Sequence, residues 1–427
     1  MKNLLLTAAR FTAYLLSGVI LALIFVGLLF LTNGFAGGYL SLAITLLAVF
    51  FFLRWIYKRQ ESIGLKVLKS LPAGLALILI IWSMIPLPRH EFRDTDGDPG
   101  FEMWNLNEDR SVSVNIHNPP DDAELREETI VFVHGGPGAY NRDFDRHFLA
   151  SFSDEGYRVL MYDQAGAGRS PLLPITEYSH MGNVDDLRAI LQKLDSPVIL
   201  FGQSYGSGVI TSFMDAYGND FDVRKLILSE PSPLPGVDLN TDHPHFTDKT
   251  TKAESADGLE FSDVVSNPRV LLAALLPAGH SFVSQEEMIG YIGPELQVQV
   301  VSNSYCMEDA ERMLPFEPLP VNILATLHIR NDFTEAHRPD LRELPQPVLL
   351  LLGACSYVPR GFAMEYFEHY TITRSHWIEN AGHILWTTPE NSAKTYAAIM
   401  SFLNDTEPPL PNRPDYDTRI RFIEDGF

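Results

Sequence analysis

The fold is decided by the stretch Pro197-Val-Ile-Leu-Phe201, which runs directly into Gly202-Gln-Ser-Tyr-Gly206. The apolar run predicts a buried strand, and the residues that follow Gly206 are compatible with a helix. Glycines two positions before and after a serine allow a sharp, strained turn from strand to helix, which exposes the serine hydroxyl at the helix N-terminus. The pattern therefore predicts that Ser204 is a catalytic nucleophile.

From Arg93 onward the chain alternates strand-like runs with amphipathic helical stretches. Such alternation predicts a mostly parallel sheet with helices on both faces, an α/β architecture. Residues 231–344 break the alternation and predict a largely helical cap insertion over the end of the sheet. We therefore expect a core made of residues 90–230 and 345–427. The expected strands are residues 111–116, 129–133, 157–162, 197–201, 225–229 and 347–352, and the expected helices include 183–194 and 391–403.

A glycine-rich segment, His134-Gly135-Gly136-Pro137-Gly138, ends one of the earlier strand-like runs. Backbone N–H groups that stabilise a developing oxyanion must approach it closely, and glycine leaves that space free. A plain Gly-Pro turn would explain Pro137 but not a histidine followed by two glycines. We predict an oxyanion hole formed by Gly135, Gly136 and the N–H group of Tyr205.

The general base is predicted from its place in the chain. His383 lies between a strand-like run, residues 371–379, and the final helix. A nucleophile first and a histidine last is the chain order of serine hydrolases with a strand-turn-helix nucleophile. The chain has no CxxC pair and no His-rich cluster, so we expect neither a metal site nor a cofactor.

Four segments, taken together and in this order, resemble the proline iminopeptidase family: HGGPG at 134–138, DQAGAGRS at 163–170, GQSYGS at 202–207 and AGH at 381–383. The resemblance covers residues 100–405. It implies the α/β-hydrolase fold and an aminopeptidase that removes N-terminal residues, proline above all, from small peptides. The basic front end is not part of that family's pattern.

Two positions depart from the pattern of this family. Ala165 stands where its members usually have arginine. The catalytic aspartate of the family would end the segment Gly353-Ala-Cys-Ser356, where this chain has serine. That carboxylate orients the catalytic histidine and stabilises its charged form, so another acid must replace it if the chain is active.

The replacement acid is predicted to be Glu230, which follows the preceding strand-like run; equally, Glu230 could do no more than end that strand. Asp332 and Asp340, near the end of the predicted cap, are further candidates. Iminopeptidases hold the free amine of the substrate with acids of the cap, but the acids here match no motif and a solvated helix face explains them as well. These acids include Glu286, Glu287, Glu308, Asp309 and Glu311.

Two other functions remain open at this stage. The same scaffold hosts esterases and lipases that act on lipid-like acyl chains, and a catalytic domain beside a bilayer would suit such a substrate. Ser356 in place of the expected acid is the feature that favours the second alternative, a catalytically impaired protein that keeps the hydrolase shell for binding. The sequence carries no indication of the oligomeric state.

Residues 1–89 form a separate apolar and basic region. Five of its basic residues fall in the loop 54–69, and such charge stays on the cytoplasmic side of a membrane. We therefore expect an integral membrane protein with a cytoplasmic N-terminus and an extracytoplasmic catalytic domain. The runs that are long and apolar enough to cross a bilayer are about residues 11–31, 38–55 and 71–87.

The charge of the chain is divided in the same way. Eight Lys or Arg and one acid give residues 1–90 a net charge of +7, which leaves −29 on the remainder of a chain whose total is −22. So acidic a domain repels nucleic acid, and we expect no nucleic-acid partner. Solubility explains the acidic surface better than attraction of a cationic substrate does.

The chain has two cysteines, Cys306 and Cys355. They could pair in an oxidising compartment, but a disulfide requires a geometry that spacing alone does not give. Two ordinary buried thiols are the expected state.

Overall fold

The structure is a computed structural model that describes residues 97–237, 283–292, 318–356, 358 and 360–410, together with residue 270 and a few isolated residues and short runs before 97. The chain divides into two compact units: Met1–Arg89 with Leu259–Tyr291, and His90–Gly258 with Ile292–Phe427. The second unit contains the sheet and the candidate site.

The predicted membrane spans at 11–31, 38–55 and 71–87 lie almost wholly outside the described residues and stay predictions. Within the part of the chain that is described, no helix combines the length and the apolarity needed to cross a bilayer. Of the predicted cap acids, Glu287 accepts a hydrogen bond from the backbone N–H of Leu87 at 3.1 Å, within the first unit, and Glu286 is exposed. The other three lie outside the described residues.

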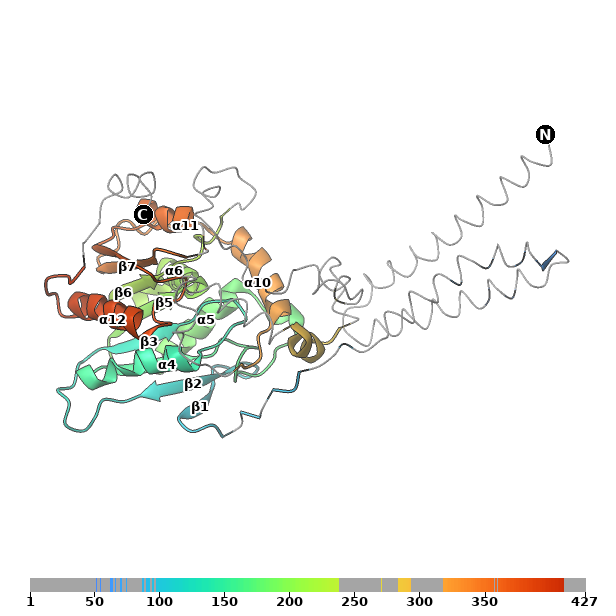
Figure 1. The fold of residues 1–427 in the computed structure, drawn as a ribbon, viewed down its shortest axis with the longest axis horizontal. Helices are drawn as coiled ribbons and strands as arrows, with labels where there is room; N and C mark the ends of the chain where they lie inside the picture. The colour runs from blue at the N-terminus through green and yellow to red at the C-terminus, as the bar shows by residue number, and fades with distance from the viewer. Residues whose placement is uncertain are drawn as a thin grey trace. The chain divides into compact units, whose positions relative to one another are not determined.

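The second unit is built on an eight-stranded sheet with the order β1-β2-β4-β3-β5-β6-β7-β8 (Figure 1). β2 pairs antiparallel with both β1 and β4 at one side of the sheet, and all other neighbouring strands are parallel. The mostly parallel α/β sheet expected from the sequence is therefore confirmed. The strands are β1 (Phe101–Asn105), β2 (Ser111–His117), β3 (Thr129–Val133), β4 (Arg158–Tyr162), β5 (Val198–Gln203), β6 (Val223–Ser229), β7 (Val348–Gly353) and β8 (Arg374–Ile378).

Helices cover both faces of the sheet, and strand side chains alternate between them with the period of two that a pleated strand imposes. In β3, Val131 and Val133 join one apolar cluster with α5, α6, α10 and α11. Ile130 and Phe132 join the opposite cluster with α4 and α12. The helices are α4 (Asp143–Ala150), α5 (His180–Leu191), α6 (Tyr205–Tyr217), α10 (Ile323–Glu335), α11 (Arg360–His369) and α12 (Pro389–Leu403).

The helix starts follow from local chemistry. The Ser179 side chain accepts a hydrogen bond from the N–H of Gly182 at the start of α5, and Thr388 does the same for Asn391 at the start of α12. Such caps satisfy N–H groups that the helix itself leaves without a partner. Asn322 caps α10, which lies inside the predicted cap yet packs Ala325 into the same apolar cluster as the sheet.

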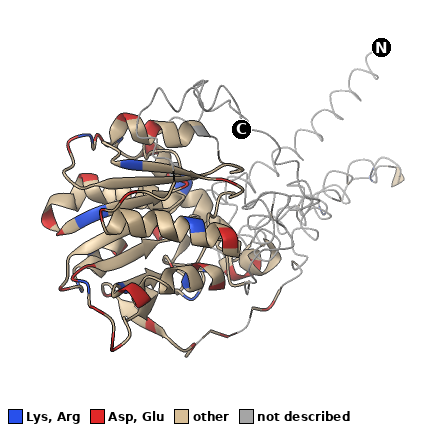
Figure 2. Ribbon diagram, turned by 60° about the vertical axis from the view of Figure 1, so that its left-hand side comes forward, with Lys and Arg blue, Asp and Glu red and all other residues tan. Residues whose placement is uncertain are grey.

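Acidic residues are spread over several helices and loops of the second unit and do not gather on one element (Figure 2). Several are already paired in the structure: Arg110 with Asp186, Arg338 with Glu365, and Lys225 with Asp405. Of these acids, Asp186 and Glu365 are buried and Asp405 is exposed.

Candidate active site

The site residues predicted from the sequence meet at the carboxyl-terminal ends of the strands. Each of them follows the carboxyl end of a parallel strand. Ser204 follows β5, Gly135 follows β3 and Glu230 follows β6. Ser356 lies just beyond β7, and His383 lies beyond β8. Open parallel sheets bind ligands at this edge, outside the carboxyl ends of their strands.

Ser204 occupies the turn between β5 and α6 in a strained conformation. Its φ of 53° and ψ of −123° lie in a region that residues other than glycine rarely adopt. Its N–H donates to the carbonyl of Ser229 at 2.9 Å, and its own carbonyl accepts from the N–H of Ser232 at 3.2 Å. These bonds hold the strained turn against the end of β6 and the loop that follows it.

The two glycines of the turn are required by space. A Cβ atom at Gly206 would lie 1.9 Å from the carbonyl oxygen of Val133, and one at Gly202 would lie 2.7 Å from the backbone nitrogen of Ser207. Either contact is far shorter than van der Waals separation, so a larger residue would push α6 away from the sheet. The sharp turn is therefore possible only with glycine at both positions.

The predicted oxyanion-hole residues lie beside the nucleophile. A Cβ atom at Gly135 would approach the Cβ of Ser204 to 2.9 Å, so the backbone of Gly135 lies directly against the serine. Tyr205 is the first residue of α6, where a helix leaves backbone N–H groups without an internal partner and favours negative charge. Gly136 has a φ of 132°, a backbone conformation that glycine adopts readily and that other residues rarely adopt. This arrangement has the parts of an oxyanion hole, and the assignment stays a prediction.

The side chain of Tyr205 is anchored inside the protein. Its hydroxyl accepts from the Asn183 amide at 3.1 Å and lies 3.0 Å from Nδ1 of His180, whose Nε2 lies 2.8 Å from the Ser212 hydroxyl. Burial lowers the pKa of His180 to about 4, so this imidazole is neutral at pH 7. Sequence reasoning did not identify His180, which is one of thirteen histidines and belongs to no motif.

His383 and Glu230 face each other although 153 positions separate them. Nδ1 of His383 lies 3.4 Å from Oε2 of Glu230, and only 4% of each residue is exposed. The other carboxylate oxygen of Glu230 accepts a hydrogen bond from the N–H of Gly353. The backbone of Glu230 has a φ of 45°, and its N–H donates to the carbonyl of Leu351. A buried carboxylate fixed in this way can orient a histidine and stabilise its charged form.

Ser356 lies at the same nitrogen. Its hydroxyl oxygen is 3.5 Å from Nδ1 of His383 and accepts a hydrogen bond from the N–H of Val358 at 3.2 Å. The position at which the resembling family carries its acid therefore does face the histidine in this chain, but with a hydroxyl. A small pocket opens beside this contact, and its lining includes Glu230, Ser356, Val358 and Trp377.

The other two candidate acids lie elsewhere. The carboxylate of Asp332 accepts hydrogen bonds from the N–H groups of His180 (2.5 Å) and Met181 (3.3 Å) and so caps the start of α5. Asp340 pairs with Arg342 on the surface, and this guanidinium lowers the pKa of the aspartate to about 2. Both acids have structural partners, which explains their presence without a catalytic role.

His134, the first residue of the HGGPG segment, joins two loops. Its Nδ1 donates to the carbonyl of Gly135 at 2.6 Å, and its Nε2 accepts from the N–H of Gln164 at 2.9 Å. The Gln164 amide in turn donates to the carbonyl of His134. Burial lowers the pKa of His134 to about 4, so the ring is neutral and acts as a structural link rather than a base. The sequence feature that marks this structural link is the histidine that directly precedes the two glycines.

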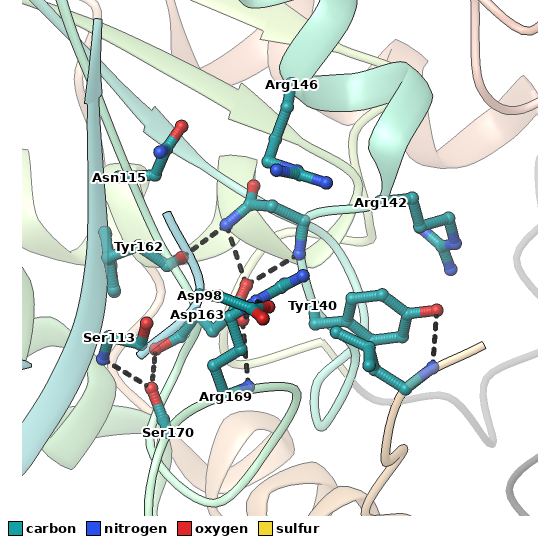
Figure 3. Close-up of polar contacts among 12 residues, drawn as sticks. Asp98, Ser113, Asn115, Tyr140, Arg142, Arg146, Tyr162, Asp163, Arg169 and Ser170 are labelled. Carbon is teal, nitrogen blue, oxygen red and sulfur yellow. Dashed lines mark hydrogen bonds and ion pairs between the residues drawn. The ribbon is translucent and has the colours of Figure 1, made fainter. Parts of the chain in front are cut away.

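The DQAGAGRS segment folds around the carboxylate of Asp163, as Figure 3 shows. One oxygen accepts from the backbone and the side chain of Asn141 at 2.8 and 3.0 Å, and the other accepts from the N–H of Arg169 at 3.0 Å. The Ser170 hydroxyl donates to the carbonyl of Asp163. The loop after β4 is thereby tied to the segment that follows HGGPG.

Cys355 is disulfide-bonded, and the only other cysteine of the sequence is Cys306, which lies outside the described residues. The expectation of two free thiols is therefore wrong. It failed because pairing depends on where the fold brings two distant residues, and spacing does not encode that. The bond ends one residue before Ser356, so it restrains the loop that faces His383.

Replacing Cys355 by serine should lower the free energy of unfolding by about 2–4 kcal/mol, because the bond closes a loop of roughly fifty residues in the unfolded chain. Urea unfolding of the full chain, with and without a reductant, measures this effect. The reductant should destabilise the wild type and leave the Cys355→Ser variant unchanged. Equal unfolding midpoints for wild type and variant would contradict the prediction.

Comparison with known proteins places this geometry in a family. A sequence profile described as "Alpha/beta hydrolase family" matches residues 130–397. A putative non-heme chloroperoxidase from Synechocystis sp. is 32% identical over 124 residues, which are 29% of this chain and 43% of that protein. A proline iminopeptidase from Arabidopsis thaliana is 33% identical over 90 residues, 21% of this chain and 23% of that protein.

Other similar proteins carry names that describe different activities. A bifunctional esterase/perhydrolase from Acinetobacter calcoaceticus is 29% identical over 111 residues, 26% of this chain and 39% of that protein. The bromoperoxidase structure from Bacillus anthracis aligns with a TM-score of 0.47 and 19% identity, covering 71% of this chain and all of that structure. The matched stretch spans less than half of each of these curated relatives.

Proposed function

The chain belongs to the alpha/beta hydrolase family and is a serine hydrolase; we propose that it acts as an aminopeptidase on small peptides and that it is anchored to a membrane. The observation that carries the proposal is the buried contact between His383 and Glu230 beside the strained turn of Ser204. It supports a complete set of nucleophile, base and acid, although this chain has Ser356 at the position where the resembling family carries its acid.

The proposed mechanism is acyl transfer. Nδ1 of His383 faces Glu230, so Nε2 takes the proton of the Ser204 hydroxyl while the serine oxygen attacks the substrate carbonyl. The N–H groups near Gly135 and Tyr205 stabilise the oxyanion that forms. His383 then gives the proton to the leaving amine, and water releases the acyl group from Ser204 by the same steps. No metal or cofactor takes part in this scheme.

Two findings support a peptide substrate over other choices. The HGGPG and DQAGAGRS segments resemble the proline iminopeptidase family, and relatives named proline iminopeptidase match the chain at 30–33% identity over about 90–100 residues. The second candidate function is a carboxylesterase, favoured by the match to an esterase/perhydrolase. The impaired binding protein loses its main support, because Glu230 lies at the nitrogen that the missing aspartate would have faced.

The proposed location is the extracytoplasmic side of a membrane, with the N-terminus in the cytoplasm. The apolar runs and the basic loop of residues 1–89 support the anchor and its orientation. The disulfide at Cys355 supports an oxidising compartment, because cytosolic thiols are kept reduced. Protease treatment of sealed right-side-out vesicles tests this: the catalytic unit should be digested without detergent, and protection of that unit would contradict it.

The activity is tested by comparing kcat/KM of the detergent-purified full chain on a prolyl arylamide and on a short-chain aryl ester. The Ser204→Ala variant is the blank for both substrates. Amide cleavage that is absent from the blank is the expected result. Ester cleavage alone would replace the aminopeptidase by the esterase, and no turnover of either substrate would favour the binding protein.

A further inference from the structure

Nδ1 of His383 faces two acceptors at nearly equal distance. The Glu230 carboxylate is 3.4 Å away and the Ser356 hydroxyl oxygen is 3.5 Å away. Both separations exceed the 2.7–3.2 Å of ordinary N–H···O hydrogen bonds. Nδ1 carries a single hydrogen when Nε2 serves as the base, and both oxygens lie at similar distances from it.

The Ser356 hydroxyl is held in place by the backbone of the loop that carries it. The N–H of Val358 donates to it, and the N–H of Ala354 donates to the carbonyl of Ile378 in β8. Cys355 donates its N–H to the carbonyl of Ala381, two residues before His383, at 2.9 Å. The loop that carries the hydroxyl and the segment that carries the histidine are therefore bonded to each other and keep a fixed separation.

Glu230 is tied to the same loop. The N–H of Gly353, the last residue of β7, donates to the carboxylate oxygen that does not face the histidine. Glu230 and Ser356 also line the same small pocket, together with Leu352, Ala363 and Trp377. Both acceptors thus belong to one structure around Nδ1.

We propose that Ser356 is a positioning residue for His383, whose hydroxyl shares the Nδ1 hydrogen with Glu230 and whose position can accept the acid itself. This inference rests on the proposed roles of Ser204 and His383, but not on the nature of the substrate. With the hydroxyl removed, the ring is restrained on one side only and Ser204 is activated less well. With a carboxylate at position 356, the site regains an acid even when Glu230 is neutralised.

The experiment measures the second-order rate constant with which a fluorophosphonate labels Ser204 in the detergent-purified full chain. The labelled amplitude reports the folded fraction, so the rate is independent of losses in folding. Ser356→Ala should label about 3–10-fold more slowly at unchanged amplitude, as expected for loss of one ordinary hydrogen bond. Glu230→Gln/Ser356→Asp should label at least about tenfold faster than Glu230→Gln alone, a recovery of about 1.4 kcal/mol or more.

Ser401→Ala is the matched control, because its hydroxyl, like that of the half-buried Ser356, is bonded to backbone but lies in α12; its labelling rate should equal that of the wild type. A Ser356→Ala rate within twofold of the wild type would overturn the proposal, and so would a double variant no faster than Glu230→Gln. The probe is not a peptide, so absence of prolyl arylamide cleavage by a wild type that labels normally counts against the aminopeptidase alone.

Discussion

Replacing Glu230 by glutamine should lower kcat by about 10³–10⁴-fold, the loss seen when the acid of a Ser-His-acid triad is neutralised in place. Glutamine keeps the size of the side chain and can still accept the hydrogen bond from the N–H of Gly353. It cannot offset the charge that develops on the imidazole of His383, and its amide group can present a donor to Nδ1. The effect should therefore fall on kcat, while KM changes little.

The measurement is steady-state kinetics of the full chain on whichever substrate the wild type cleaves. Glu365→Gln is a matched control, because Glu365 is a buried glutamate that also accepts a backbone N–H, from Leu234, and pairs with Arg338. It makes no described contact with His383, so it should cost stability but leave kcat within a few-fold. If Glu230→Gln retained more than a tenth of the wild-type kcat, the acid of this enzyme would be another residue.

The geometry around Glu230 shows why the sequence alone could not decide whether this residue is the acid of the triad. Glu230 and Ser356 both follow strands, β6 and β7, and these strands are parallel neighbours in the sheet. Two residues after adjacent parallel strands reach the same edge, so both were candidates in principle. What the sequence lacks is the orientation of each side chain at the turn. In Glu230 that orientation depends on a left-handed backbone conformation with a φ of 45°, which no pattern of residue types predicts for a glutamate.

The sheet itself was predictable because buried parallel strands read as continuous apolar runs. The run 129–133 matches β3 in full, and the other expected strands differ from β2 and β4–β7 by one or two residues at their ends. β1 was missed: Phe101–Asn105 is half-exposed at the antiparallel edge, where an apolar run is not required. α10 lies within residues 231–344, the predicted cap, and its packing against α5 and the apolar core is a tertiary contact that the sequence pattern does not show.

Asp163 was quoted only as part of a motif, and the structure gives it a demanding role. Its side chain is buried, and its oxygens accept three N–H groups, two from Asn141 and one from Arg169 of its own loop. The guanidinium of Arg169, itself buried, lies 3.7 Å away and pairs on its other side with Asp98 at 3.1 Å (Figure 3). Nothing but a charged carboxylate satisfies all of these donors at once.

Asp163→Asn should therefore lower the free energy of unfolding by about 3–5 kcal/mol, the cost of breaking a buried ion pair on one side. An asparagine amide must turn its NH₂ group toward Asn141 or toward the N–H of Arg169, which places donor against donor. Urea unfolding followed by circular dichroism measures the change. Asp185→Asn is the control, an exposed aspartate bonded to the hydroxyl of Tyr217, and should stay within about 0.5 kcal/mol. Equal free energies of unfolding for the two variants would mean that the loop after β4 tolerates a neutral side chain at position 163, and would contradict the prediction.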